Sequence, residues 1–121
     1  MVIVIIEEAR AVEAIEEIAA VPGIDVLFIG TNDLAFSLGL RGNTADPKHR
    51  EAVGRIVAAA KKHNLPVGRP IGSAEQMKAA LAEGFTFFQG PADLVMLRAG
   101  ARPLLDALGK TGFDPKTQPL Y

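Results

Sequence analysis

The stretch Asp25-Val26-Leu27-Phe28-Ile29-Gly30-Thr31-Asn32-Asp33 is a short apolar run that ends abruptly in glycine and polar side chains. Three further runs share its β-branched and aromatic character, with little alternation of apolar and polar residues; they are Val2 to Ile6, Leu65 to Ile71 and Phe85 to Gln89. Runs of this kind are typical of parallel strands that are covered on both faces. The sequence therefore predicts four strands of one parallel sheet.

Helical patterns separate the four runs. Residues 12–19 place Val12, Ile15, Ile18 and Ala19 on one face, and Pro22-Gly23 ends that segment. A second helix is expected over 47–63, where Val53, Ile56, Val57 and Ala60 form an apolar stripe. A third is expected over 73–84 and opens with a capping box from Ser73 to Gln76. The last is expected over 92–108, with interruptions at Gly100 and Pro103.

The resulting order is βαβαβαβα, which predicts an α/β fold with right-handed crossovers and a parallel sheet. A (β/α)8 TIM barrel takes roughly 250 residues, so four units in 121 residues correspond to half of one. We expect residues 1–108 to form this half barrel and residues 109–121 to be a C-terminal extension. Because half a barrel leaves sheet edges and an inner face uncovered, we also expect self-association.

Composition excludes several function classes. The net charge of -1 creates no overall field that would attract nucleic acid or an anionic membrane. The absence of cysteine excludes a disulfide scaffold, a thiolate metal site and a cysteine nucleophile. The apolar run at the N-terminus is too short for a signal sequence or a membrane span, so a cytoplasmic location is expected.

Candidate site residues follow the strands, because ligands bind at the carboxyl ends of parallel strands. Glu7 follows the first run and Asp33 follows the second, and two such carboxylates can share one Mg²⁺ whose remaining positions are filled by water. The backbone N–H groups of Gly30, Thr31, Asn32 and Asp33 form a candidate site for a substrate carboxylate or phosphate. The simpler alternatives are a solvated Glu7 in the first turn of a helix and an Asp33 that caps a helix or turn.

Other polar residues are weaker candidates. Arg69 lies near the end of the third run, between Gly68 and Pro70; it either points into the pocket or belongs to a segment that only shapes the strand end. His49 is expected on a polar helical face and His63 at a helix C-terminus, so neither histidine is a catalytic candidate. No catalytic residue is therefore assigned within this chain.

The order of these segments resembles the HpcH/HpaI aldolase and citrate lyase family. The resemblance rests on residues 6–12, on the run from Ile18 through Gly30-Thr31-Asn32-Asp33-Leu34, on Ser37-Leu38-Gly39, on Gly84-Phe85 and on residues 97–101. It covers most of the chain, but only the C-terminal half of that family's barrel. The resemblance implies a class II aldolase, a carbon–carbon lyase that acts on 2-oxo acids and yields pyruvate or a similar oxo acid and an aldehyde.

The resemblance also implies a site. Glu7 and Asp33 match the positions that hold Mg²⁺, Mn²⁺ or a similar ion such as Co²⁺ in the family, and the amides of 31–33 match a segment that helps to hold the oxo-acid carboxylate. The partners implied are a small-molecule 2-oxo acid and an aldehyde, together with a homo-oligomer in which the helix from Ala92 onward packs on a neighbouring subunit. Nucleic acid and membrane are not implied.

Two departures and two alternatives accompany this interpretation. Family members commonly carry glutamine at the position of Ile5 and serine at the position of Ala35. The other half of the family's barrel supplies an acid/base histidine with its aspartate partner and an arginine that binds the substrate. One alternative is a non-catalytic half barrel that acts as an interaction module. The other is a receiver-like signalling domain with a doubly wound sheet.

Overall fold

The structure is a computed structural model that describes residues 1–108. The chain divides into two units at Gly90 and Pro91, so the two are described separately. The first unit holds all four strands, and the described part of the second is one helix. The predicted extension, residues 109–121, lies outside the described residues.

The sheet has four parallel strands in the order β1-β2-β3-β4, with bounds β1 Ile3–Ile6, β2 Val26–Ile29, β3 Val67–Pro70 and β4 Phe87–Gln89. This confirms the predicted parallel sheet of alternating strands and helices. Strands that neighbour each other in sequence order are typical of a barrel segment, whereas a doubly wound sheet reverses its order at a switch point. The receiver-like alternative is therefore wrong.

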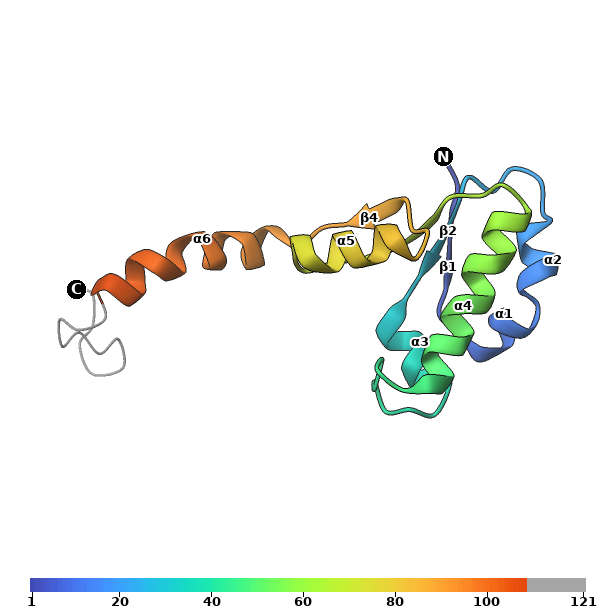
Figure 1. The fold of residues 1–121 in the computed structure, drawn as a ribbon, viewed down its shortest axis with the longest axis horizontal. Helices are drawn as coiled ribbons and strands as arrows, with labels where there is room; N and C mark the ends of the chain where they lie inside the picture. The colour runs from blue at the N-terminus through green and yellow to red at the C-terminus, as the bar shows by residue number, and fades with distance from the viewer. Residues whose placement is uncertain (109–121) are drawn as a thin grey trace. The chain divides into compact units, whose positions relative to one another are not determined.

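Six helices accompany the strands in residues 1–108 (Figure 1); they are α1 Ala9–Glu13, α2 Ile15–Ala19, α3 Thr31–Ser37, α4 Pro47–Lys62, α5 Ala74–Ala82 and α6 Asp93–Leu108. Two predicted helix starts are confirmed by side-chain caps. Asp46 Oδ1 accepts a hydrogen bond of 2.8 Å from the Lys48 amide, and Ser73 Oγ accepts one of 3.2 Å from the Gln76 amide.

Two predictions about helix continuity are wrong. The single helix expected to carry Val12, Ile15, Ile18 and Ala19 on one face is divided at Ala14, whose φ of -93° and ψ of 15° lie outside helical geometry. The interruption expected at Gly100 and Pro103 does not occur, because α6 continues through both residues. A proline inside a helix removes one backbone hydrogen bond, and the helix here tolerates that loss.

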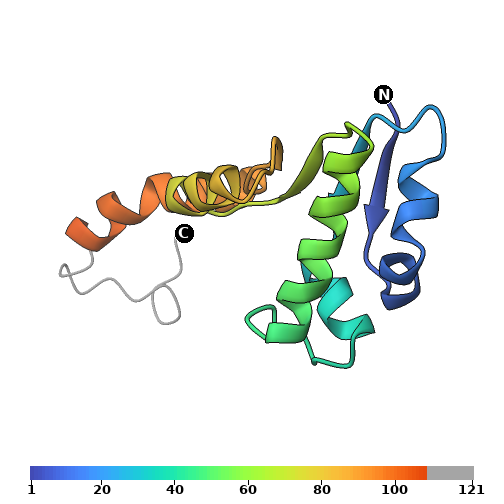
Figure 2. The same cartoon turned by 45° about the vertical axis from the view of Figure 1, so that its right-hand side comes forward.

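The core of the first unit lies between the sheet and a layer formed by α1, α2 and α4, which pack side by side (Figure 2). Its largest fully buried side chains are Ile6, Leu27, Ile29, Leu34, Ile56 and Phe85. The face of α4 that enters this core carries Ala52, Ile56, Ala59 and Ala60, whereas Val53 and Val57 are only half-buried. The predicted stripe is therefore rotated, because alanines rather than valines lie closest to the sheet.

The opposite face of the sheet exposes a row of apolar side chains. Ile3 and Ile5 are 39% and 55% exposed, and the rings of Phe28 and Phe87 meet edge to face with centroids 6.1 Å apart. Gly68 lies between the two rings, where an added Cβ would come within 2.8 Å of each. Apolar strands covered on both faces were expected, but among residues 1–90 the helices α1, α2 and α4 cover only one face.

No helix among the described residues is long and apolar enough to cross a membrane.

An ion-pair cluster on the surface of the helix layer joins α2 to α4. Glu16 of α2 accepts hydrogen bonds of 2.9 Å from Lys62 Nζ and 3.0 Å from His63 Nε2, both at the C-terminal end of α4. This cluster ties α2 to α4.

We expect the purified chain to self-associate through the uncovered apolar face of the sheet. The driving force is the removal of Ile3, Ile5, Phe28 and Phe87 from water, together with pairing of the open edge strands. Light scattering after size-exclusion chromatography measures the mass, and a single monodisperse monomer at micromolar concentration would contradict this expectation.

The Glu16 cluster predicts a dependence of stability on pH. Hydrogen bonds from Lys62 and then His63 lower the pKa of Glu16 below its ordinary value of 4.5. A depressed pKa in the folded state contributes stability above the unfolded-state pKa, and the contribution is lost as the pH falls through the folded-state value. We therefore expect wild type to be more stable than Glu16→Gln at pH 6, with the difference beginning to shrink as the pH falls below about 4.5 and disappearing below the lowered folded-state pKa. Urea denaturation measures this, with the neighbouring Glu17→Gln as the control for loss of a charge on α2.

Candidate metal and oxo-acid site

Glu7 lies immediately beyond β1 and faces the end of β2. The register pairs Ile6 with Ile29, and the Gly30 amide donates a hydrogen bond of 3.1 Å to the Ile6 carbonyl, so Glu7 stands opposite Gly30. A Cβ added at Gly30 would lie 2.8 Å from Glu7 Cβ and 2.9 Å from Glu7 Oε2. The Glu7 carboxylate therefore lies directly over Gly30, in space that any larger residue would fill.

Asp33 lies in the first turn of α3, three residues beyond Gly30. Gly30 is the N-cap residue of α3, and no side chain makes a capping hydrogen bond there, so Asp33 does not act as a helix cap. Glu7 precedes Glu8, the N-cap of α1, and so lies outside the first turn of that helix. Both carboxylates are exposed and belong to the same carboxyl end of the sheet.

The donor chemistry of this pair suits a hard divalent cation. Two exposed carboxylates offer oxygen ligands and leave room for water, as Mg²⁺ prefers. No group of three or more His, Cys, Asp or Glu side chains that could hold a metal ion occurs in residues 1–108. Glu7 over Gly30 and Asp33 in the first turn of the next helix are the two carboxylates that these strand ends offer, and a metal held by them would take its other ligands from water or substrate.

The segment between the two carboxylates supplies backbone donors. Gly30, Thr31, Asn32 and Asp33 form the start of α3, where the first N–H groups have no partner within the helix. Asn32 and Asp33 are exposed, while Thr31 is half-buried. The predicted substrate-binding residues are thus contiguous with both predicted metal ligands.

Arg69 lies on the other side of the sheet. Because Gly68 pairs with Phe28 and shares its face, the next residue in β3 points toward the helices. The Arg69 guanidinium carbon lies 5.3 Å from the centroid of the Phe85 ring, and Nη1 is 3.9 Å from Glu83 Oε2. These contacts favour the structural role for Arg69 over the pocket role.

His49 is buried, which contradicts its predicted place on a polar helical face. Its side chain is only 4% exposed, and Nε2 lies 3.0 Å from the carbonyl oxygen of Thr31. The signal was present in the spacing, because His49 precedes the buried residues Ala52 and Ile56 by three and seven positions and therefore shares their face. The second histidine, His63, contacts Glu16 as described above.

The comparisons with known proteins identify relatives of the chain. The model of one protein family, HpcH/HpaI aldolase/citrate lyase, matches residues 1–99. The chain is 42% identical over 106 residues to a hydroxypyruvate/pyruvate aldolase from Paraburkholderia phytofirmans, covering 84% of this chain and 40% of that protein. It is 37% identical over 103 residues to a 2-dehydro-3,6-dideoxy-6-sulfogluconate aldolase from Pseudomonas putida, covering 85% of this chain and 40% of that one.

A solved structure shows the same fold. The crystal structure of an HpcH/HpaI aldolase/citrate lyase family protein from Burkholderia cenocepacia superposes with a TM-score of 0.80 at 36% identity, covering 88% of this chain and 41% of that one. The chain thus spans about two fifths of the length of the relatives that it matches.

Gly30→Ala tests the close packing of Glu7 over β2. The added Cβ would meet Glu7 Cβ, which the β1 backbone holds in place, so the two strand ends must move apart. We expect a loss of about 1–3 kcal/mol in the free energy of unfolding. Gly54→Ala in α4 is the matched control, because nothing lies within 4 Å of its added Cβ. There the higher helix propensity of alanine should stabilise by about 0.5–1 kcal/mol. Equal effects of the two substitutions in urea denaturation would contradict the packing.

Proposed function

The chain belongs to the HpcH/HpaI aldolase/citrate lyase family, and on that premise we propose that it provides the metal and oxo-acid half of a class II aldolase. The reaction is metal-dependent aldol cleavage or condensation of a 2-oxo acid, which yields or consumes pyruvate or a similar oxo acid and an aldehyde. The observation that carries the proposal is the Glu7 carboxylate lying over Gly30, at the sheet end from which α3 brings Asp33.

Glu7 and Asp33 hold a divalent cation, Mg²⁺, Mn²⁺ or Co²⁺, in this proposal. When bound, such an ion supplies Lewis-acid stabilisation of the negative charge that develops on the keto oxygen as the carbon–carbon bond breaks. Glu7 is held by β1, and Asp33 by the helix that follows β2. Because each carboxylate follows a different strand of a parallel pair, the pairing brings both to the same edge of the sheet.

The start of α3 holds the carboxylate of the oxo acid. Backbone N–H groups at a helix start point outward and carry partial positive charge, so they favour an anion. In this arrangement the amides of Thr31, Asn32 and Asp33 bind the substrate carboxylate. Gly30 supplies the open space beside them, because its own amide already donates to the Ile6 carbonyl. The side chain of Asp33 joins the metal site. The name of the Paraburkholderia relative, a hydroxypyruvate/pyruvate aldolase, supports a small 2-oxo acid as the ligand.

Proton transfer is not assigned to this chain. It contains two histidines, of which His49 is buried against the Thr31 carbonyl and His63 contacts Glu16. Among the described residues, neither histidine forms a hydrogen bond to an aspartate. We therefore propose that this chain binds the metal and the oxo acid, and that turnover needs acid/base groups from the part of the relatives that it does not match.

The proposed assembly is a homo-oligomer that uses α6. Within the described part of its own unit, none of the residues of this helix is buried, and its exposed apolar side chains include Leu94, Val95, Leu97, Leu104, Leu105 and Leu108. Burying them against another subunit would remove that surface from water. The other partners are a 2-oxo acid and an aldehyde.

Calorimetric titration of the purified chain with Mn²⁺, with and without pyruvate, tests the proposed function. We expect Mn²⁺ binding that pyruvate strengthens, and at least a tenfold loss of affinity in Glu7→Gln and in Asp33→Asn because each removes a charged oxygen ligand. Glu8→Gln is the matched control, because this adjacent exposed carboxylate contacts Arg10 instead. Flat titrations of the wild-type chain would contradict the proposal and favour a non-catalytic half barrel.

A further inference from the structure

The proposed site depends on a short helix that has no cap of its own. Helix α3 has seven residues, and no side chain makes a capping hydrogen bond at its start. A single helix of this length is not stable alone, so its position must come from contacts with the rest of the chain. Leu34 and Ala35 are fully buried and anchor one side of it. Burial of these two apolar side chains holds α3 against the core, but it does not by itself fix the rotation of the helix about its axis, and therefore the direction in which Asp33 points.

The N-terminal end of α3 is held by His49 of α4. A carbonyl oxygen only accepts hydrogen bonds, so the 3.0 Å contact with Thr31 requires that His49 Nε2 carries the proton and donates. His49 is the only buried polar or charged residue in the described part of the chain. Burying an imidazole costs free energy unless it is hydrogen-bonded, so this bond is the feature that makes a histidine suitable here.

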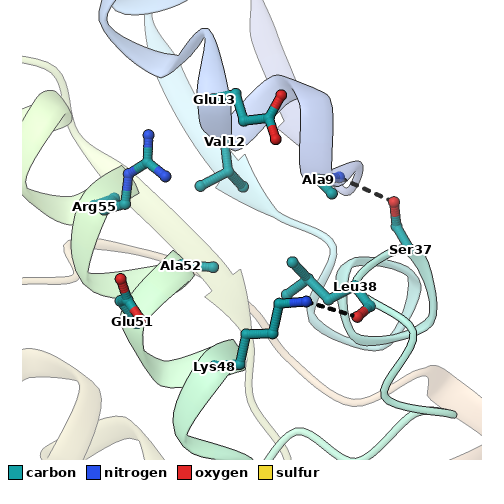
Figure 3. A pocket seen from close by; sticks show the side chains of 9 residues that line it. All are labelled: Ala9, Val12, Glu13, Ser37, Leu38, Lys48, Glu51, Ala52 and Arg55. Carbon is teal, nitrogen blue, oxygen red and sulfur yellow. Dashed lines mark hydrogen bonds between the residues drawn. The ribbon is translucent and has the colours of Figure 1, made fainter.

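The C-terminal end of α3 makes contacts with two other segments of the chain. Ser37 Oγ accepts a hydrogen bond of 2.9 Å from the backbone N–H of Ala9, two residues beyond Glu7 (Figure 3). Figure 3 also shows Lys48 Nζ donating to the carbonyl of Leu38, at 3.3 Å, where α3 ends. The Ser37 bond therefore joins the helix that carries Asp33 directly to the segment that carries Glu7.

We infer that the bonds from His49 to Thr31 and from Ala9 to Ser37 together form a clamp on α3 that sets Asp33 against Glu7. His49 and Ser37 are thus positioning residues for the proposed metal site, and neither touches the metal or the oxo acid. This inference rests on the proposed function for its consequence in binding. The effect of the clamp on the stability of α3 can also be measured without a ligand, by amide hydrogen exchange.

The alternative is that His49 only fills space in the core, and a pair of substitutions separates the two roles. His49→Leu keeps an apolar side chain of similar bulk and removes the donor. His49→Gln keeps an N–H group near the position of Nε2 and so can restore the bond to Thr31. A space-filling role predicts that leucine is the better replacement, whereas the clamp predicts that glutamine is.

Binding of Mn²⁺ in the presence of pyruvate is the first measurement. We expect about tenfold weaker affinity in His49→Leu, recovery to near the wild-type value in His49→Gln, and a smaller loss in Ser37→Ala. His63→Gln is the control, because its contact with Glu16 lies away from α3. Wild-type binding with unchanged affinity in His49→Leu would overturn the inference while leaving the proposed function standing. Absence of binding in wild type would instead overturn the proposed function.

Amide hydrogen exchange followed by NMR is the second measurement and needs no ligand. The reporters are the backbone N–H groups of Leu34 and Leu38, which bond to the carbonyls of Gly30 at 2.8 Å and Leu34 at 2.9 Å. We expect at least fivefold faster exchange at these amides in His49→Leu and in Ser37→Ala, relative to the amides of α4. Because Ser37 is exposed, Ser37→Ala keeps the test valid if His49→Leu does not fold. Unchanged exchange at both reporters would overturn the clamp.

Discussion

The parallel pairing of β1 with β2 determines which side chains meet at the carboxyl edge of the sheet. Ile6 pairs with Ile29, so the residues that follow them, Glu7 and Gly30, end up face to face. A shift of one residue in this register would turn Glu7 toward the helix layer, since successive side chains point to opposite faces. The buried set Ile6, Leu27 and Ile29 opposes such a shift, because it would expose their side chains. The hydrophobic core thus fixes the geometry of a polar site that lies outside it.

Gly30 shows how closely the two strands approach at that edge. Its Cα lies beneath the Glu7 carboxylate, and the absence of a side chain is what allows the carboxylate to lie there. The same residue is the N-cap of α3, so one position serves both the packing of Glu7 and the start of the helix that carries Asp33. A glycine is therefore needed at this position because any side chain would occupy the space of the Glu7 side chain at the end of β2.

Much of the fold could be predicted from sequence, because strands and capped helices are encoded locally. The four apolar runs correspond to β1 to β4, and Asp46 and Ser73 mark the starts of α4 and α5. The strands are shorter than their runs, since residues such as Leu65 and Phe85 flank the paired segments. The division between α1 and α2 at Ala14 was missed, because alanine favours helix and nothing in the local pattern signals a break.

The candidate site was only partly accessible to such reasoning. The order of strand ends placed Glu7 and Asp33 at one edge, but the direction of Arg69 depends on the register of β3, which no local pattern specifies. His49 was misassigned because a histidine beside Lys48 and Arg50 reads as part of a charged face, while its alignment with Ala52 and Ile56 placed it inside. Its partner is a backbone carbonyl, and backbone acceptors carry no side-chain signature in a sequence. Positioning residues of this kind become visible only when the chain is folded, and for that reason they are harder to predict than the carboxylates that they orient.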